Sequence, residues 1–84
     1  MDIKDWINNW FENNSDLNLE EIIKFQDEDY FAKGWIDSFK FIRMVTEIEE
    51  KFKINFSNDE FQDKKFSTIN GLSEIIEARI EKKL

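Results

Sequence analysis

The chain contains no proline, and Gly34 and Gly71 are its only two glycines. A β-rich domain needs such residues in the turns between its strands, whereas long helices are interrupted by them. Their scarcity therefore favours an all-α protein. The residues are 40% hydrophobic and include nine Phe and three Trp, which is enough for the packed core of one small domain over residues 1–84.

Apolar residues recur at spacings of three and four in three segments, and this periodicity predicts three main helices. The first has its apolar residues between Ile3 and Phe11 and ends near Asn13–Asn14, the second covers residues 38–52, and the third runs from a cap at 67–68 to about residue 82. The side chains expected on the buried side of the second helix are Phe41, Met44, Val45, Ile48 and Phe52.

Ser57 and Glu60 form a capping box, which predicts one short helix between the second and third main helices. Phe61 is expected to anchor this short helix to the core. A long loop over residues 15–35 joins the first two main helices and contains enough apolar residues for a short turn of helix. The shorter loops elsewhere favour an antiparallel arrangement around one core.

The charge of the chain and the residue types that it lacks exclude several classes of function. A formal net charge of −7 without a large basic cluster argues against nucleic-acid binding and suits a partner protein with a basic patch. The chain has no cysteine and no histidine, which excludes disulfides, thiolate metal sites and Ser/His/Asp triads. We therefore expect no enzyme activity and no metal site. No apolar stretch can span a membrane and no signal pattern appears, so the cytoplasm is the expected location.

Ser38 is the main functional candidate, because it stands where the second main helix should begin, shortly after Gly34. A helix N-terminus has unpaired backbone N–H groups and the positive end of the helix dipole, so it favours a phosphate at this hydroxyl. Ser38 also suits an ordinary N-cap, since serine is among the preferred capping residues. Asp37 has two interpretations: it could cap the helix, or it could lie beside a group attached to Ser38 and contact the enzyme that attaches it.

The segment from Gly34 to Phe39, Gly-Trp-Ile-Asp-Ser-Phe, resembles the attachment motif of acyl carrier proteins, in which the serine lies in Asp-Ser-Leu or Asp-Ser-Phe. Residues 66–69, Phe-Ser-Thr-Ile, resemble the Ile-Thr-Thr-Val that leads into the fourth helix of that family. With its length and the order of its helices, the chain is similar to stand-alone carriers such as D-alanyl and peptidyl carrier proteins. The resemblance implies an acyl-carrier-like four-helix bundle with three main helices and one short helix.

The resemblance also implies that Ser38 carries a 4′-phosphopantetheine arm, which a phosphopantetheinyl transferase attaches from coenzyme A with magnesium. The arm supplies the thiol that the chain lacks, and an acyl or aminoacyl group is carried on it as a thioester. The implied partners are this transferase, an acyl- or aminoacyl-activating ligase, and an acyl transferase or synthase. The carrier is expected to be a monomer that catalyses nothing itself.

Residues beside the serine are expected to contact these partner enzymes. They are Phe39, Lys40, Ile42, Arg43 and Glu47. The better-known fatty acid carriers have acidic residues at the positions of Lys40 and Arg43. The reversed charge predicts a carrier of a specialised pathway that does not serve a standard fatty acid synthase.

A non-covalent helical adaptor is the alternative function. Such a protein would bind a partner helix through exposed aromatic residues and its acidic surface, and it would need no arm on Ser38. Modification by a phosphopantetheinyl transferase distinguishes the two functions.

Overall fold

The computed structural model describes residues 3–83, which form five α-helices and one short 3₁₀-helix and contain no strand. The elements are α1 (Ile3–Asn14), α2 (Leu19–Lys24), α3 (Ser38–Phe52), α4 (Asn58–Gln62), the 3₁₀-helix η1 (Lys64–Ser67) and α5 (Ile69–Lys83). The all-α fold class expected from the sequence is confirmed. None of the helices in the described residues is both long enough and apolar enough to cross a membrane.

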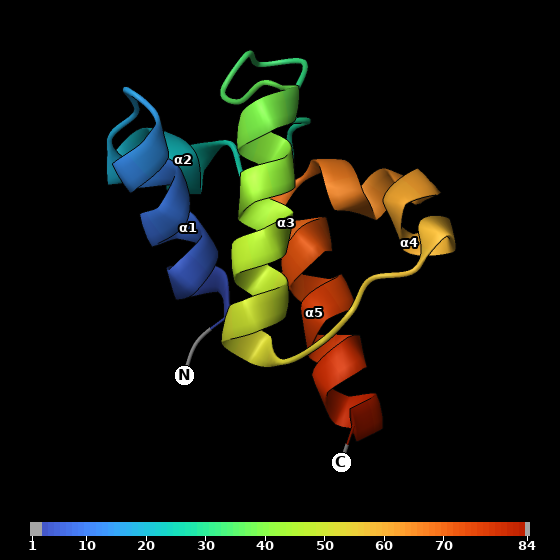
Figure 1. Ribbon diagram of the computed structural model, residues 1–84. Coiled ribbons are helices and arrows are strands. Elements are labelled where there is room, and N and C mark those ends of the chain that lie inside the picture. The colour runs from blue at the N-terminus through green and yellow to red at the C-terminus, as the bar shows by residue number, and fades with distance from the viewer. Residues whose placement is uncertain (1–2, 84) are drawn as a thin grey trace.

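The three long helices surround one core, and their directions differ in part from the antiparallel arrangement expected. α1 and α3 run in opposite directions, whereas α3 and α5 run in the same direction (Figure 1). The reason is that α4 and η1 carry the chain back toward the end of the bundle where α3 begins. As a result α5 starts part-way along α3 and runs beside its second half (Figure 1).

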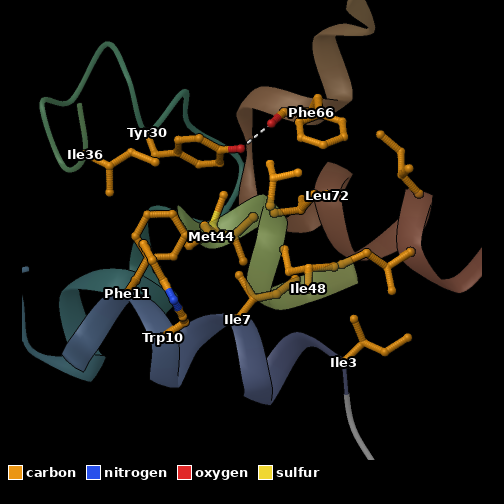
Figure 2. Packing of buried hydrophobic residues seen from close by; sticks show 14 of the residues in the cluster. Ile3, Ile7, Trp10, Phe11, Tyr30, Ile36, Met44, Ile48, Phe66 and Leu72 are labelled. Atoms are coloured by element: carbon orange, nitrogen blue, oxygen red, sulfur yellow. Dashed lines mark hydrogen bonds between the residues drawn. The ribbon is translucent and has the colours of Figure 1, made fainter. Parts of the chain in front are cut away.

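The core lies between α1, α3 and α5 and contains aromatic and aliphatic side chains from all three (Figure 2). The largest fully buried side chains are Tyr30, Phe11, Phe66, Ile7, Ile22, Met44, Ile48, Ile69, Leu72 and Ile76. Burial of this apolar surface is the main stabilising contribution in a domain of this size.

The expected buried side of α3 is confirmed at its centre, where Met44, Val45 and Ile48 are buried. Phe41 and Phe52 lie at the edges of this side and are only half-buried.

Phe61 anchors the short helix only at the edge of the core: its ring packs against those of Phe41, Phe56 and Phe66, but it remains 40% exposed. Phe66 in η1 is the more deeply buried of the two, with 2% of its surface exposed. The sequence pattern did not predict η1, since a single turn of 3₁₀-helix has no apolar periodicity of its own.

The capping signals of the second half of the chain are confirmed. Ser57 and Glu60 form the reciprocal capping box at the start of α4. The Thr68 hydroxyl accepts a hydrogen bond from the Gly71 N–H at 2.9 Å and so caps α5. α4 is fastened to α5 by a bidentate pair in which the Arg79 guanidinium donates to the Glu60 carboxylate at 2.6 to 3.0 Å.

The long connection between α1 and α3 contains α2, which the sequence suggested only as a possible turn of helix. Asn18 caps α2 by accepting from the Glu21 N–H at 2.9 Å, and Ile22 is buried against the core. A compact turn over residues 29–34 follows, and Gly34 ends it with a positive φ of 73°. Glycine adopts this conformation without the steric cost that other residues have. The chain then closes over the end of α3 where Ser38 lies (Figure 1).

Candidate functional site

The start of α3 is fixed by Asp37, which has an extended backbone and precedes the first helical residue. Its carboxylate accepts a hydrogen bond from the backbone N–H of Lys40 at 2.9 Å, and its carbonyl accepts from the N–H of Phe41 at 2.9 Å. Asp37 is therefore the N-cap of α3, as one of its two interpretations from the sequence proposed. The neighbouring Ile36 is buried and holds this end of the loop against the core.

Ser38 is the first residue of α3, so its interpretation as the N-cap is wrong. The chain's five serines all lie within residues 3–83, and Ser38 is the one that is exposed. Its hydroxyl has no hydrogen-bond partner among the described residues. The hydroxyl is therefore free to react.

The backbone at the start of α3 supplies donors next to this hydroxyl. The N–H groups of Ser38 and Phe39 have no acceptor within the described part of the chain, because the Asp37 side chain satisfies only the N–H of Lys40. Free N–H groups and the positive end of the helix dipole stabilise an anion at this point. The residues present therefore fit a phosphate ester on Ser38.

Two of the expected partner-binding residues, Lys40 and Glu47, point toward α1. The Lys40 ammonium donates to the backbone carbonyl of Asn14 at 2.8 Å, at the C-terminus of a helix that has no basic residue in its own last turn. A cation is favourable there because of the helix dipole. Glu47 accepts a hydrogen bond from the Trp10 indole N–H at 2.8 Å. Both residues thus link α3 to α1, a role that the sequence did not reveal.

The other three expected partner-binding residues lie on the solvent side of α3. Phe39 is 85% exposed and Ile42 is 63% exposed, which makes them the most exposed of the large hydrophobic residues described. The Arg43 side chain is 70% exposed, and its Nε lies 3.8 Å from the Glu47 carboxylate. Phe39, Ile42 and Arg43 together form what we call the outer face of α3. This surface begins next to Ser38.

Tyr30 is a buried residue near this site that sequence reasoning did not single out. Its hydroxyl donates to the backbone carbonyl of Phe66, and its own N–H donates to the carbonyl of Ser67 at 3.0 Å. Burial raises the pKa of the Tyr30 phenol, with a smaller contribution from the negative charge of Asp29, so the hydroxyl stays protonated as a donor. No local sequence motif predicts this contact, because its two residues are 36 positions apart.

Within residues 3–83 no group of three or more acidic residues is arranged to hold a metal ion. The start of α3 combines an exposed hydroxyl with backbone N–H donors, and the adjacent Asp37 carboxylate is occupied as the cap of the helix.

Comparisons with known proteins agree with this geometry. A family model described as "Phosphopantetheine attachment site" matches residues 14–76, which include Asp37, Ser38 and the whole of α3. A D-alanyl carrier protein of Streptococcus suis (strain 05ZYH33) is 32% identical over 72 residues, covering 86% of this chain and 87% of that protein. A D-alanyl carrier protein of Streptococcus uberis is 31% identical over 58 residues, covering 69% of this chain and 73% of that protein. No solved structure shows a significant match.

The family match extends over most of the chain, and the two relatives cover 86% and 69% of it. The alternative of a non-covalent adaptor is not favoured by these matches. The chain belongs to the phosphopantetheine-binding carrier protein family, and it is a carrier protein that bears a covalently attached 4′-phosphopantetheine arm.

Proposed function

We propose that the arm is attached to the Oγ of Ser38. The observation that carries this proposal is that Ser38 is the exposed serine of the chain, with a free hydroxyl at a helix N-terminus. On modification the Ser38 hydroxyl gives up its proton and its oxygen bonds to the phosphorus next to the pantetheine of coenzyme A. The pyrophosphate P–O bond of coenzyme A breaks in the same step, and adenosine 3′,5′-bisphosphate leaves. The N–H groups of Ser38 and Phe39 are available to donate to the resulting anion.

The arm supplies a thiol, on which a carboxylic acid can be carried in an activated form. The residues of the chain itself present this arm and add no catalytic group, so the protein acts with partner enzymes. Members of this family interact with a transferase that attaches the arm and a ligase that loads it. Since both enzymes use cytoplasmic metabolites, coenzyme A and ATP, the cytoplasm is the proposed place of action, and the carrier is proposed to act there as a monomer.

The cargo that we propose is an aminoacyl group, with D-alanine as the first candidate. The support is that the relatives from Streptococcus suis and Streptococcus uberis are named as D-alanyl carrier proteins. A dedicated ligase would activate the amino acid with ATP and transfer it to the carrier. The basic residue Arg43 on the outer face of α3, where fatty acid carriers are acidic, supports a specialised pathway in place of a fatty acid synthase.

We further propose that the outer face of α3 (Phe39, Ile42 and Arg43) contacts the partner enzymes. Exposed aromatic and aliphatic side chains beside a modified residue are suited to such contacts, because their burial on association is favourable. Lys40 and Glu47, whose charged groups contact α1, hold the helix in place and contribute less directly.

The proposed cargo can be tested on the protein isolated from its native cells after rapid acid quenching. Intact mass spectrometry then identifies the group on the arm. The expected result is a holo-protein fraction with the added mass of alanine, and chiral analysis of the released amino acid should give the D form. A fatty acyl group on the arm, or normal turnover of the loaded carrier by a fatty acid ketosynthase, would contradict the proposed cargo.

A further inference from the structure

We propose that Tyr30 is a positioning residue for the modification of Ser38, because it fixes the loop that leads into the attachment site. The loop consists of residues 29–37 and closes over the start of α3 (Figure 1). The inference rests on the proposed attachment at Ser38. Tyr30 does not touch the Ser38 hydroxyl, but it determines the conformation of the loop that the transferase contacts.

Tyr30 connects the loop to η1 through both its side chain and its backbone. The side chain is fully buried and points from the loop toward η1, where its hydroxyl donates to the Phe66 carbonyl (Figure 2). The Tyr30 N–H donates to the Ser67 carbonyl at 3.0 Å, and the Tyr30 carbonyl accepts from the Trp35 N–H at 3.0 Å. Tyr30 thus joins the start of the turn to Trp35 at its end, and it also connects the turn to η1.

η1 is a firm support for this connection. Phe66 is buried in the core, and Asp63 caps η1 by accepting from the Lys65 N–H at 2.9 Å. The backbone of Lys65 packs so closely on α5 that a Cβ at Gly71 would overlap it. Because η1 cannot shift without disturbing α5, Tyr30 is bonded to a fixed part of the fold.

The turn between Tyr30 and Ser38 is itself closely hydrogen-bonded. The Asp29 carboxylate accepts from the N–H groups of Phe31 at 2.8 Å and Ala32 at 3.1 Å. The Lys33 N–H donates to the Asp29 carbonyl at 3.0 Å, which closes the turn. A fixed Tyr30 therefore fixes the turn as a unit, and with it the approach to Asp37 and Ser38.

A transferase that reaches Ser38 must also contact this loop, because the loop borders the exposed start of α3. Without the Tyr30 hydroxyl, the buried Phe66 carbonyl loses its partner and the loop opens more often. Only the closed fraction of the protein presents the correct surface. The apparent affinity for the transferase falls in proportion to this fraction, whereas the chemical step at Ser38 is unchanged.

The kinetics of loading test this inference. The variants are Tyr30→Phe and Asp29→Ala, with Asp29→Asn as the conservative variant that keeps the oxygen acceptor of the turn. Ile7→Val in α1 is the control, because it weakens the buried core without touching the loop. Each variant is incubated with coenzyme A, magnesium and a broad-specificity phosphopantetheinyl transferase, and intact mass spectrometry follows the rate over a range of carrier concentrations.

One lost hydrogen bond changes the opening equilibrium of the loop by about three- to tenfold. We therefore expect Tyr30→Phe and Asp29→Ala to raise the KM for the carrier, by up to that factor, with little change in kcat. Asp29→Asn and Ile7→Val should keep the parental KM. Asp29 is exposed and can be replaced without disturbing the core. The comparison of Asp29→Ala with Asp29→Asn therefore tests the loop even where Tyr30→Phe folds poorly.

Amide hydrogen exchange gives an independent measurement. In Tyr30→Phe the amides of Tyr30 and Trp35 should exchange about three- to tenfold faster, whereas the core amides of α1 should change no more than in Ile7→Val. A parental KM in both Tyr30→Phe and Asp29→Ala, or an equal rise in Ile7→Val, would overturn the inference. Failure of the parent protein to be loaded at all would instead contradict the attachment at Ser38.

Discussion

The carboxylate of Asp37 accepts a hydrogen bond from the backbone N–H of Lys40 at 2.9 Å, across the first turn of α3. This bond gives the capping role to Asp37 and leaves the adjacent Ser38 hydroxyl without a partner among residues 3–83. Asp37 therefore stabilises the helix start, whereas Ser38 is the proposed site of modification, and substitutions can separate the two roles.

Asp37→Ala should lower the free energy of unfolding by about 1 kcal/mol, because the Lys40 N–H loses its acceptor. Ser38→Ala should change it by less than about 0.5 kcal/mol, since the exposed hydroxyl contributes no bond to the fold. Urea denaturation of both variants measures the difference. An equal loss in the two variants would mean that Ser38 shares the cap.

The pair between Glu60 and Arg79 should make stability depend on acidic pH. Hydrogen bonding from the Arg79 guanidinium holds the pKa of Glu60 below its ordinary value of 4.5. A carboxyl with a lowered pKa in the folded state stabilises above its unfolded pKa, and this contribution disappears as the pH falls through the folded pKa.

The parent should therefore be more stable than Glu60→Gln at pH 7, and the difference should shrink as the pH falls from about 5 through the lowered pKa of Glu60. Thermal or urea unfolding of both proteins between neutral and acidic pH provides the comparison. A difference that stays constant over this range would show that the charge of Glu60 is not involved.

Phe66 and Phe52 should differ in their contribution to stability, although both are aromatic residues next to the core. Phe66 is 2% exposed, so Phe66→Ala should cost about 3–5 kcal/mol. Phe52 is half-buried at the edge of α3, so Phe52→Ala should cost about 1–3 kcal/mol. The two unfolding free energies, measured with urea, test this order. A larger loss for Phe52→Ala would contradict the burial described above.

Arg43→Glu should alter reactions with partner enzymes and leave the fold nearly unchanged. The side chain is 70% exposed and its contact with Glu47 is long, so the stability loss should stay within about 0.5 kcal/mol. The rate of loading by the transferase should change, because Arg43 lies on the outer face of α3. Lys51→Glu, the same charge change at an exposed position in the last turn of α3, is the control. Equal rates for the two variants would remove Arg43 from the docking surface.

The main helices could be predicted from the sequence because their signals are local. The spacing of apolar residues placed α3 at residues 38–52, and the Ser57–Glu60 pair placed the start of α4. The contacts that orient the site could not be predicted in this way. The bond from Tyr30 to Phe66 and that from Lys40 to Asn14 join residues that are 36 and 26 positions apart.

The sequence could not show which phenylalanine is the more deeply buried, or which residue caps α3, and the physical reason is the same in both cases. Phe61 and Phe66 are both aromatic and lie five positions apart, and the sequence pattern gives neither a clear advantage as the anchor. The turn of η1 directs Phe66 into the core and leaves Phe61 at its edge. Similarly, a serine and an aspartate can both cap a helix, and only the backbone geometry shows that Asp37 does so.

The most direct test of the central claim is an intact mass spectrum after incubation with coenzyme A, magnesium and a broad-specificity phosphopantetheinyl transferase. The samples are the parent, Ser38→Ala, and Ser57→Ala as a serine control at another helix N-terminus. The account predicts the addition of one phosphopantetheine to the parent and to Ser57→Ala, and none to Ser38→Ala. Modification of Ser38→Ala, or no modification of the parent by several such transferases, would contradict it.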